Sequence, residues 1–207
     1  MKKIILLLSV VAISFPALAQ KTKKQVKPKA ESMAPQPGKE SLKEHLEIQE
    51  QRQVGPMHQL LIQWNGHWIE QMKVWTEGNN DPKVIVLHRE SMIVCEGRFL
   101  ESKIRGEMYH MPYEANSVIG YDNAKMVFVK TWYDNLGTSI LVLEGTYDPK
   151  TSSIDFRGNT TDFKTKMPVM IHQKLTFSDP TKQLLEVFVI DKAGKETKTM
   201  EIISNRG

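Results

Sequence analysis

The chain of 207 residues carries 28 Lys and Arg against 24 Asp and Glu, a formal net charge of +4, and one cysteine, Cys95. Residues 1–40 hold eight Lys and two Glu, so residues 41–207 have a net charge of −2. A slightly acidic folded region argues against a nucleic-acid partner, which needs a basic surface. A single cysteine excludes an intramolecular disulfide and a thiolate zinc cluster.

The first 40 residues are expected to lie outside the folded domain. Residues 1–19 have a basic start, an apolar run and the small-residue ending Ala17-Leu18-Ala19, which is typical of a secretory signal peptide and not of a transmembrane anchor. Residues 20–40 are rich in Lys, Pro and Gln and have little to bury, which predicts a disordered linker. We therefore expect a periplasmic or secreted protein, cleaved near Ala19.

Residues 41–64 are predicted to form a short helical cap. Ser41 and Glu44 have the spacing of a capping box, and Gly55-Pro56 interrupts the helix that follows. An apolar stripe then recurs at helical spacing and ends at Trp64, and Gly66 is placed to terminate this second piece.

Residues 65–207 show the two-residue period of β-strands. Turn-forming segments such as GNNDP, YDNLG and SDPTK separate the apolar runs at intervals of about ten to fifteen residues. This spacing predicts an all-β antiparallel meander of about 8–10 strands, closed into a barrel or folded into a sandwich.

Residues 126–133 are apolar on both faces of the predicted strand, although Lys130 lies on the same face as Phe128 and Trp132. One explanation is that helices or a second subunit cover the outer face. The other is that the inner face lines a cavity for an apolar ligand. A barrel of this size can hold one small ligand or be filled by its own side chains.

Several sequence blocks resemble the bacterial family known as domain of unknown function 1579, over residues 55–206. The blocks are Gly97-Arg98-Phe99-Leu100, Gly120-Tyr121-Asp122-Asn123, Thr131-Trp132-x-Asp134, Gly137-Thr138, Glu144-Gly145-Thr146-Tyr147-Asp148 and Lys198-Thr199-Met200-Glu201. Gly66-His67-Trp68 also resembles the Gly-x-Trp opening of lipocalin-type barrels. The resemblance implies a calycin-like barrel and carries no established activity.

The sequence offers no motif for metal binding or covalent catalysis. The six histidines show no HExxH or related spacing, and we predict neither a metal nor a cofactor. His88, His110 and His172 lie on predicted strands, so convergence inside a barrel remains an alternative. Cys95 lies in the apolar run SMIVCEGRF, which predicts a buried thiol.

The candidate ligand-binding residues are Arg98, Trp132, Asp134 and Glu144. Glu144 lies in the apolar run LVLEGTY and would be a candidate acid or base if its side chain pointed inward, since burial raises the pKa of a carboxyl group. The alternatives are a structural ion pair for Glu144 and a turn role for Asp134.

The tryptophans around Gly66 predict the structure of the barrel opening. Trp64 ends the cap, Gly66 allows the turn, and Trp68 begins the first strand. We expect this joint to seal one end of the barrel.

These features favour an exported calycin-like barrel that binds a small hydrophobic or amphipathic ligand in its lumen. One alternative is a non-covalent hydrolase or isomerase that uses Glu144. Another is a structural or interaction module whose outer apolar face forms a homodimer contact.

Overall fold

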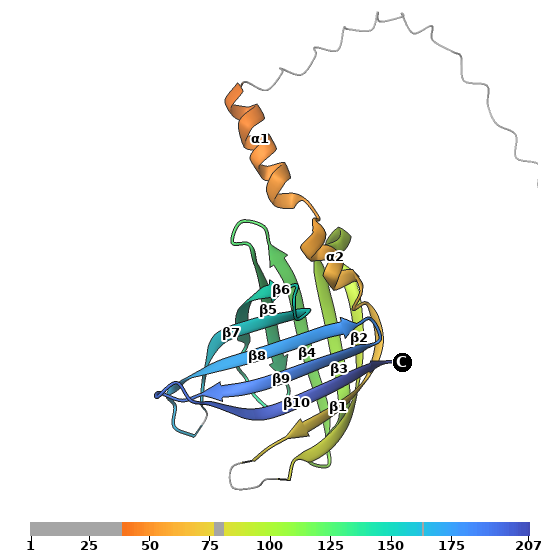
Figure 1. Ribbon diagram of the computed structural model, residues 1–207, viewed down its shortest axis with the longest axis vertical. Helices are drawn as coiled ribbons and strands as arrows, with labels where there is room; N and C mark the ends of the chain where they lie inside the picture. Colours follow the sequence, from red (N-terminus) through yellow and green to blue (C-terminus); the bar gives the residue numbers. More distant parts are fainter. Residues whose placement is uncertain (1–38, 77–80, 163) are drawn as a thin grey trace, which may run out of the picture. The chain divides into compact units, whose positions relative to one another are not determined.

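Alternating apolar and polar residues build ten antiparallel strands that close into a barrel (Figure 1). The computed structural model describes residues 39–76, 81–162 and 164–207, so the expected signal peptide and nearly all of the expected linker lie outside the described residues. The strands are β1 (Gly66–Val74), β2 (Lys83–Val94), β3 (Phe99–Met108), β4 (Met111–Asp122), β5 (Val127–Asp134), β6 (Leu141–Asp148), β7 (Ser153–Thr161), β8 (Pro168–Asp179), β9 (Lys182–Ile190) and β10 (Glu196–Arg206).

Each strand pairs with the next in sequence, and β1 pairs with β10 to close the barrel. In this closing register Trp68 lies opposite Arg206 on one side and Arg89 on the other. Closure gives each of these strands a hydrogen-bonded neighbour on both sides, so the barrel has no edge strand within the described residues. The predicted closed meander of about 8–10 strands is confirmed.

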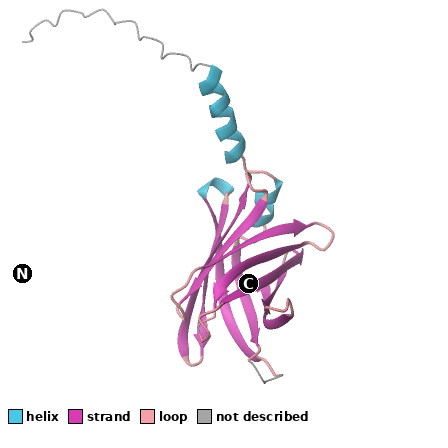
Figure 2. Ribbon diagram, turned by 90° about the vertical axis from the view of Figure 1, so that its left-hand side faces the viewer, coloured by secondary structure: helices cyan, strands magenta, loops and turns pink. Residues whose placement is uncertain are grey.

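The predicted cap is divided into two helices, α1 (Lys39–Arg52) and α2 (Pro56–Ile62). The side chains of α1 from Leu42 onward are exposed, whereas α2 buries His58 and Leu61. The backbone N–H of Gly55 donates to His58 Nδ1 at 3.1 Å, and burial lowers the pKa of His58. Of the two helices, α2 is therefore the one that packs at the end of the barrel (Figure 2).

The joint between α2 and β1 is built around Trp68. Gly66 has a backbone φ of +120°, a conformation that residues with a Cβ atom rarely adopt. Trp68 Nε1 donates to the Trp64 carbonyl at 3.0 Å. The Arg206 guanidinium lies 4.5 Å from the Trp68 ring centroid and donates to the carbonyls of Gln63 and Asn65. Arg206 of β10 thus holds residues 63–65, which lead into β1, in place.

Two apolar clusters fill different ends of the barrel. The closed-end cluster lies against α2 and comprises Leu61, Trp64, Leu100, Ile119, Phe128, Leu143, Ile154, Phe156, Ile171, Leu175 and Val187. The mouth cluster lies toward the opposite end and comprises Met72, Leu87, Ile104, Met108, Tyr113, Ala115 and Ile202. The closed end is sealed by aromatic contacts such as Trp64 with Phe177, whose ring centroids are 4.7 Å apart.

Cys95 is exposed, contrary to the buried position expected from its apolar neighbours. It begins a short 3₁₀ turn, η1 (Cys95–Gly97), between β2 and β3, and it has a positive φ of 50°. Strand β2 ends at Val94, so the inward and outward alternation of the run SMIVC stops before Cys95.

Candidate functional site

A belt of polar side chains lies inside the barrel between the two apolar clusters. Strand alternation places every second residue inward, and on β5 this puts Lys130 between the buried Phe128 and the half-buried Trp132. We define the polar belt as Glu70, Arg89, Ser91, Ser102, Ser117, Lys130, Gln173, Gln183 and Ser204. Its members come from eight of the ten strands, so it encircles the lumen.

One side of the polar belt contains a buried ion pair. Arg89 Nε lies 2.8 Å from Glu70 Oε1, and the two side chains are 11% and 6% exposed. Ser204 Oγ donates to the same carboxylate oxygen at 2.9 Å, and Arg89 Nη2 donates to Gln183 Oε1 at 2.7 Å. Burial lowers the pKa of Arg89, and the Glu70 charge opposes that shift. Glu70 therefore has its charge matched inside the lumen.

The Lys130 ammonium lacks such a match. Its Nζ donates to Gln173 Oε1 at 2.8 Å, and no ion pair joins it to a carboxylate among the residues the structure describes. The rings of Phe156 and Trp132 lie 5.7 and 5.8 Å away. Burial, aided by the nearby Arg89 charge, lowers the pKa of Lys130 to about 8. The amine is thus a buried cation that has no ion-pair partner within the polar belt.

Three polar atoms of the belt have no hydrogen-bond partner within the described part of the chain: Ser117 Oγ, Gln183 Nε2 and Arg89 Nε. Arg89 Nε is nevertheless 2.8 Å from Glu70 Oε1 in the ion pair, so Ser117 Oγ and Gln183 Nε2 are the two atoms left without any partner in that part of the chain. Buried polar atoms are nearly always paired with protein, water or ligand. These atoms therefore mark where a polar group would be held.

Two adjoining cavities occupy the lumen. The inner chamber, about 50 Å³, lies within the polar belt and against Trp64. The outer chamber, about 190 Å³, is lined mainly by apolar side chains, among them Met72, Leu87, Ile171 and Val187. Both chambers are bordered by Lys130, Trp132, Leu185 and Ile202. The lumen is thus polar at its centre and apolar toward the mouth.

Asp134 lines the outer chamber, where it accepts hydrogen bonds from neighbouring side chains. Tyr113 Oη and Trp132 Nε1 both donate to Asp134 Oδ2, at 3.4 and 3.2 Å, and the backbone N–H of Leu136 donates to Oδ1 at 3.0 Å. Burial and the Asp134 charge raise the pKa of Tyr113, so this phenol stays neutral. Asp134 therefore positions Trp132 and also shapes the turn after β5.

Of the four predicted ligand-binding residues, Trp132 and Asp134 line the outer chamber, whereas Arg98 and Glu144 lie outside the lumen. Arg98 bonds the carbonyls of Cys95 and Arg52 near the end of α1. Glu144 lies on the outer face, with a 51% exposed side chain, 2.6 Å from Lys125 Nζ. The hydrolase hypothesis required Glu144 to point into the lumen, and that orientation is wrong.

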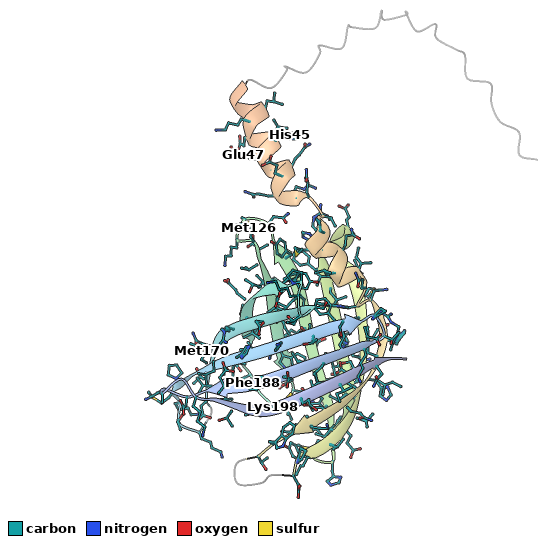
Figure 3. The ribbon with its side chains drawn as sticks, in the orientation of Figure 1. His45, Glu47, Met126, Met170, Phe188 and Lys198 are labelled. Carbon is teal, nitrogen blue, oxygen red and sulfur yellow. The ribbon has the colours of Figure 1, made fainter. Side chains whose placement is uncertain are left out.

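The three strand histidines do not converge in the lumen. His88 is exposed, His110 lies in the β3–β4 turn, and His172 lies on the outer face between Asp155 and Glu196 at 2.9 and 3.1 Å. The same outer face carries Phe188, stacked on His172, and Lys198, paired with Glu186 (Figure 3). No group of His, Cys, Asp and Glu within the described residues is arranged to hold a metal ion.

The outer wall also carries exposed apolar side chains, which is where a homodimer contact was predicted. Val84 and Val86 on β2 and Ile69 on β1 are examples, with exposures of 60%, 52% and 45%. The dimer stays a prediction, and light scattering across a range of protein concentrations would reject it if the mass remained that of a monomer.

Solved structures confirm the fold at low sequence identity. The S-type phycobiliprotein lyase CPES from Guillardia theta is 11% identical, with 78% of this chain and 97% of that chain covered and a TM-score of 0.52. Rv2717c from M. tuberculosis is 12% identical, with 75% and 99% covered and a TM-score of 0.51. At such identity the likeness concerns the fold alone.

No functionally curated protein matches the sequence. Residues 53–206 match the family described as protein of unknown function DUF1579, which spans the end of the cap and nearly the whole barrel. This range agrees with the resemblance seen in the sequence blocks. The chain therefore belongs to the DUF1579 family.

Proposed function

We propose that the protein binds one small amphipathic molecule in the barrel lumen. The apolar part of the ligand lies in the outer chamber, and its polar part points to the polar belt. The observation that carries this proposal is the outer chamber of about 190 Å³, lined mainly by apolar side chains and adjoining buried polar atoms that have no partner within the described residues.

The volume of the outer chamber limits the size of the ligand. An apolar cavity of roughly 150 Å³ in another protein binds benzene. A chamber of about 190 Å³ therefore suits a single ring or a short hydrocarbon chain. Other side chains of the closed-end cluster, such as Leu61, Leu100 and Phe128, fill the end of the barrel beneath α2, so a large ligand that filled the whole lumen would not fit.

Titration calorimetry with two matched pairs of compounds tests this function. The pairs are octanoate with 1-octanol and phenylacetate with 2-phenylethanol, and we expect the wild-type protein to bind at least one member. Val187→Phe should weaken that binding at least tenfold, because Val187 lines the outer chamber and a ring there fills it.

Val84→Phe is the matched control, since Val84 is exposed on the outer face and the same substitution there leaves the lumen open. Circular dichroism should show the same fold for both variants, and Ile171→Phe, also in the outer chamber, is the second blocking variant. Binding by neither pair, or equal binding by the blocked variants and the control, would overturn the proposal.

We further propose that the protein acts outside the cytoplasm, on the basis of the signal-peptide pattern of residues 1–19. No helix among the described residues has the length and apolar character needed to cross a membrane. Mass spectrometry of the protein from its own host should give the mass of a chain that begins near Gln20. Retention of residues 1–19 in the periplasmic or secreted fraction would contradict the proposed cleavage.

A further inference from the structure

The polar belt carries more positive than negative charge. Arg89 and Lys130 are its two cations, and Glu70 is its one carboxylate. Glu70 is paired with Arg89 and accepts a hydrogen bond from Ser204. Asp134 lies outside the belt, in the outer chamber, where it accepts from the neutral Tyr113 and Trp132, and its charge is not among those that shift the pKa of Lys130. A buried cation without a counter-charge is costly. The belt is therefore one negative charge short of balance.

We propose that the head group of the ligand is a carboxylate, held between Lys130 Nζ and the unpartnered Ser117 Oγ and Gln183 Nε2. This assignment rests on the proposed function and specifies the chemical class of ligand at the same site. The apolar body then extends past Trp132 into the outer chamber, because Lys130 and Trp132 border both chambers.

The hydrogen-bonding character of the belt supports an acceptor head group. Lys130 Nζ and Gln183 Nε2 are donors only, and the Ser117 hydroxyl can donate. An ionised carboxylate only accepts, so it can satisfy all three. An ammonium head group would instead place a third cation beside Lys130 and Arg89.

The size and charge of the inner chamber favour a carboxylate over a phosphate. One water molecule needs roughly 10–15 Å³ of such cavity space, so a chamber of about 50 Å³ holds a group of only a few heavy atoms. A carboxylate brings one negative charge, which balances the belt. A phosphate monoester brings about two at neutral pH and would leave the belt with an excess of negative charge.

The acid–base state of Lys130 agrees with the same head group. Burial lowers its pKa to about 8 in the free protein. A bound carboxylate would favour the charged amine and raise that pKa again. The charged and titratable groups around Lys130 are Arg89 from β2, Glu70 from β1, Tyr113 from β4 and Asp134 from β5. Of these, Tyr113 has a raised pKa and stays neutral.

The test compares octanoate with 1-octanol on the full-length protein and on Lys130→Met, by titration calorimetry. Because a charge-assisted hydrogen bond is stronger than a neutral one, we expect the wild type to bind octanoate at least tenfold more tightly than 1-octanol. Lys130→Met should lose that preference, mainly through weaker octanoate binding. Lys125→Met, which removes an exposed lysine on the outer side, should keep it.

A pH series on the wild type gives an independent readout. Between about pH 8 and about pH 10, octanoate binding should weaken as Lys130 loses its proton, and 1-octanol binding should stay constant. Equal binding of octanoate and 1-octanol by the wild type, or a pH-independent affinity for octanoate, would overturn the carboxylate assignment and leave the proposed function standing. If neither compound nor the phenyl pair binds, both proposals fail.

Discussion

Lys130→Met is expected to raise the free energy of unfolding of the ligand-free protein by about 2 kcal/mol at pH 7. A pKa lowered from 10.5 to about 8 corresponds to a penalty of roughly 3 kcal/mol for keeping the buried amine charged. The substitution removes this penalty but also the hydrogen bond to Gln173, whose loss offsets about 1 kcal/mol of the stabilisation. Methionine has a similar length and fits an apolar wall, so urea unfolding should show a higher midpoint for the variant.

The advantage of Lys130→Met should depend on pH in a specific direction. Below about pH 8 the amine is protonated in both the folded and the unfolded chain, so the penalty is fully present. Between about pH 8 and 10.5 the folded chain binds fewer protons at Lys130 than the unfolded chain does. Stability of the wild type therefore rises with pH relative to the variant, and the gap narrows. If the two proteins have the same free energy of unfolding at pH 7, or if their difference stays constant up to pH 10, Lys130 is not charged and desolvated in the lumen.

Glu70→Gln should have the largest destabilising effect, a loss of about 3–5 kcal/mol. The substitution keeps the shape of the side chain but leaves Arg89 and Lys130 as two buried cations with no carboxylate in the belt. Removing one partner of a buried ion pair typically costs that much, because the other charge stays in a medium that solvates it poorly. Urea unfolding at pH 7 measures the loss.

Glu144→Gln is the control for the same chemical change on the barrel exterior. Glu144 pairs with Lys125 in solvent, so this variant should unfold at the same urea concentration as the wild type. The double variant Glu70→Gln/Lys130→Met should recover part of the loss, since it removes one of the two cations that repel each other. A Glu70→Gln protein as stable as the wild type would contradict a charged, buried belt.

The barrel was predictable from the sequence because alternation is a local property. The runs around Trp132, Leu143 and Leu185 place apolar residues two apart, and their bounding turns set the strand lengths. The same alternation, applied strictly, also places Glu144 outward, since its neighbours Leu143 and Gly145 face the lumen. Arg98 could not be assigned this way, because it follows a turn in which the phase is lost.

The polar belt was only partly visible in the sequence. The sequence places Lys130 on the same strand face as Phe128 and Trp132, and the structure turns that face inward. Glu70 and Arg89 are likewise in phase with buried apolar neighbours. Their meeting depends on how the strands are staggered around the closed barrel. No local pattern specifies that arrangement, so the ion pair and the excess positive charge required the structure.

A crystal structure of the protein with 6-bromohexanoate would show whether the ligand binds inside the barrel, because anomalous scattering locates the bromine. We expect one bromine in the outer chamber, near Leu87 and Ile171, with the carboxylate against Lys130 Nζ. The same soak of Val187→Phe should show no bromine there. Bromine bound on the outer face near Val84, or a lumen that stays without ligand at saturating concentration, would contradict a binding site inside the barrel.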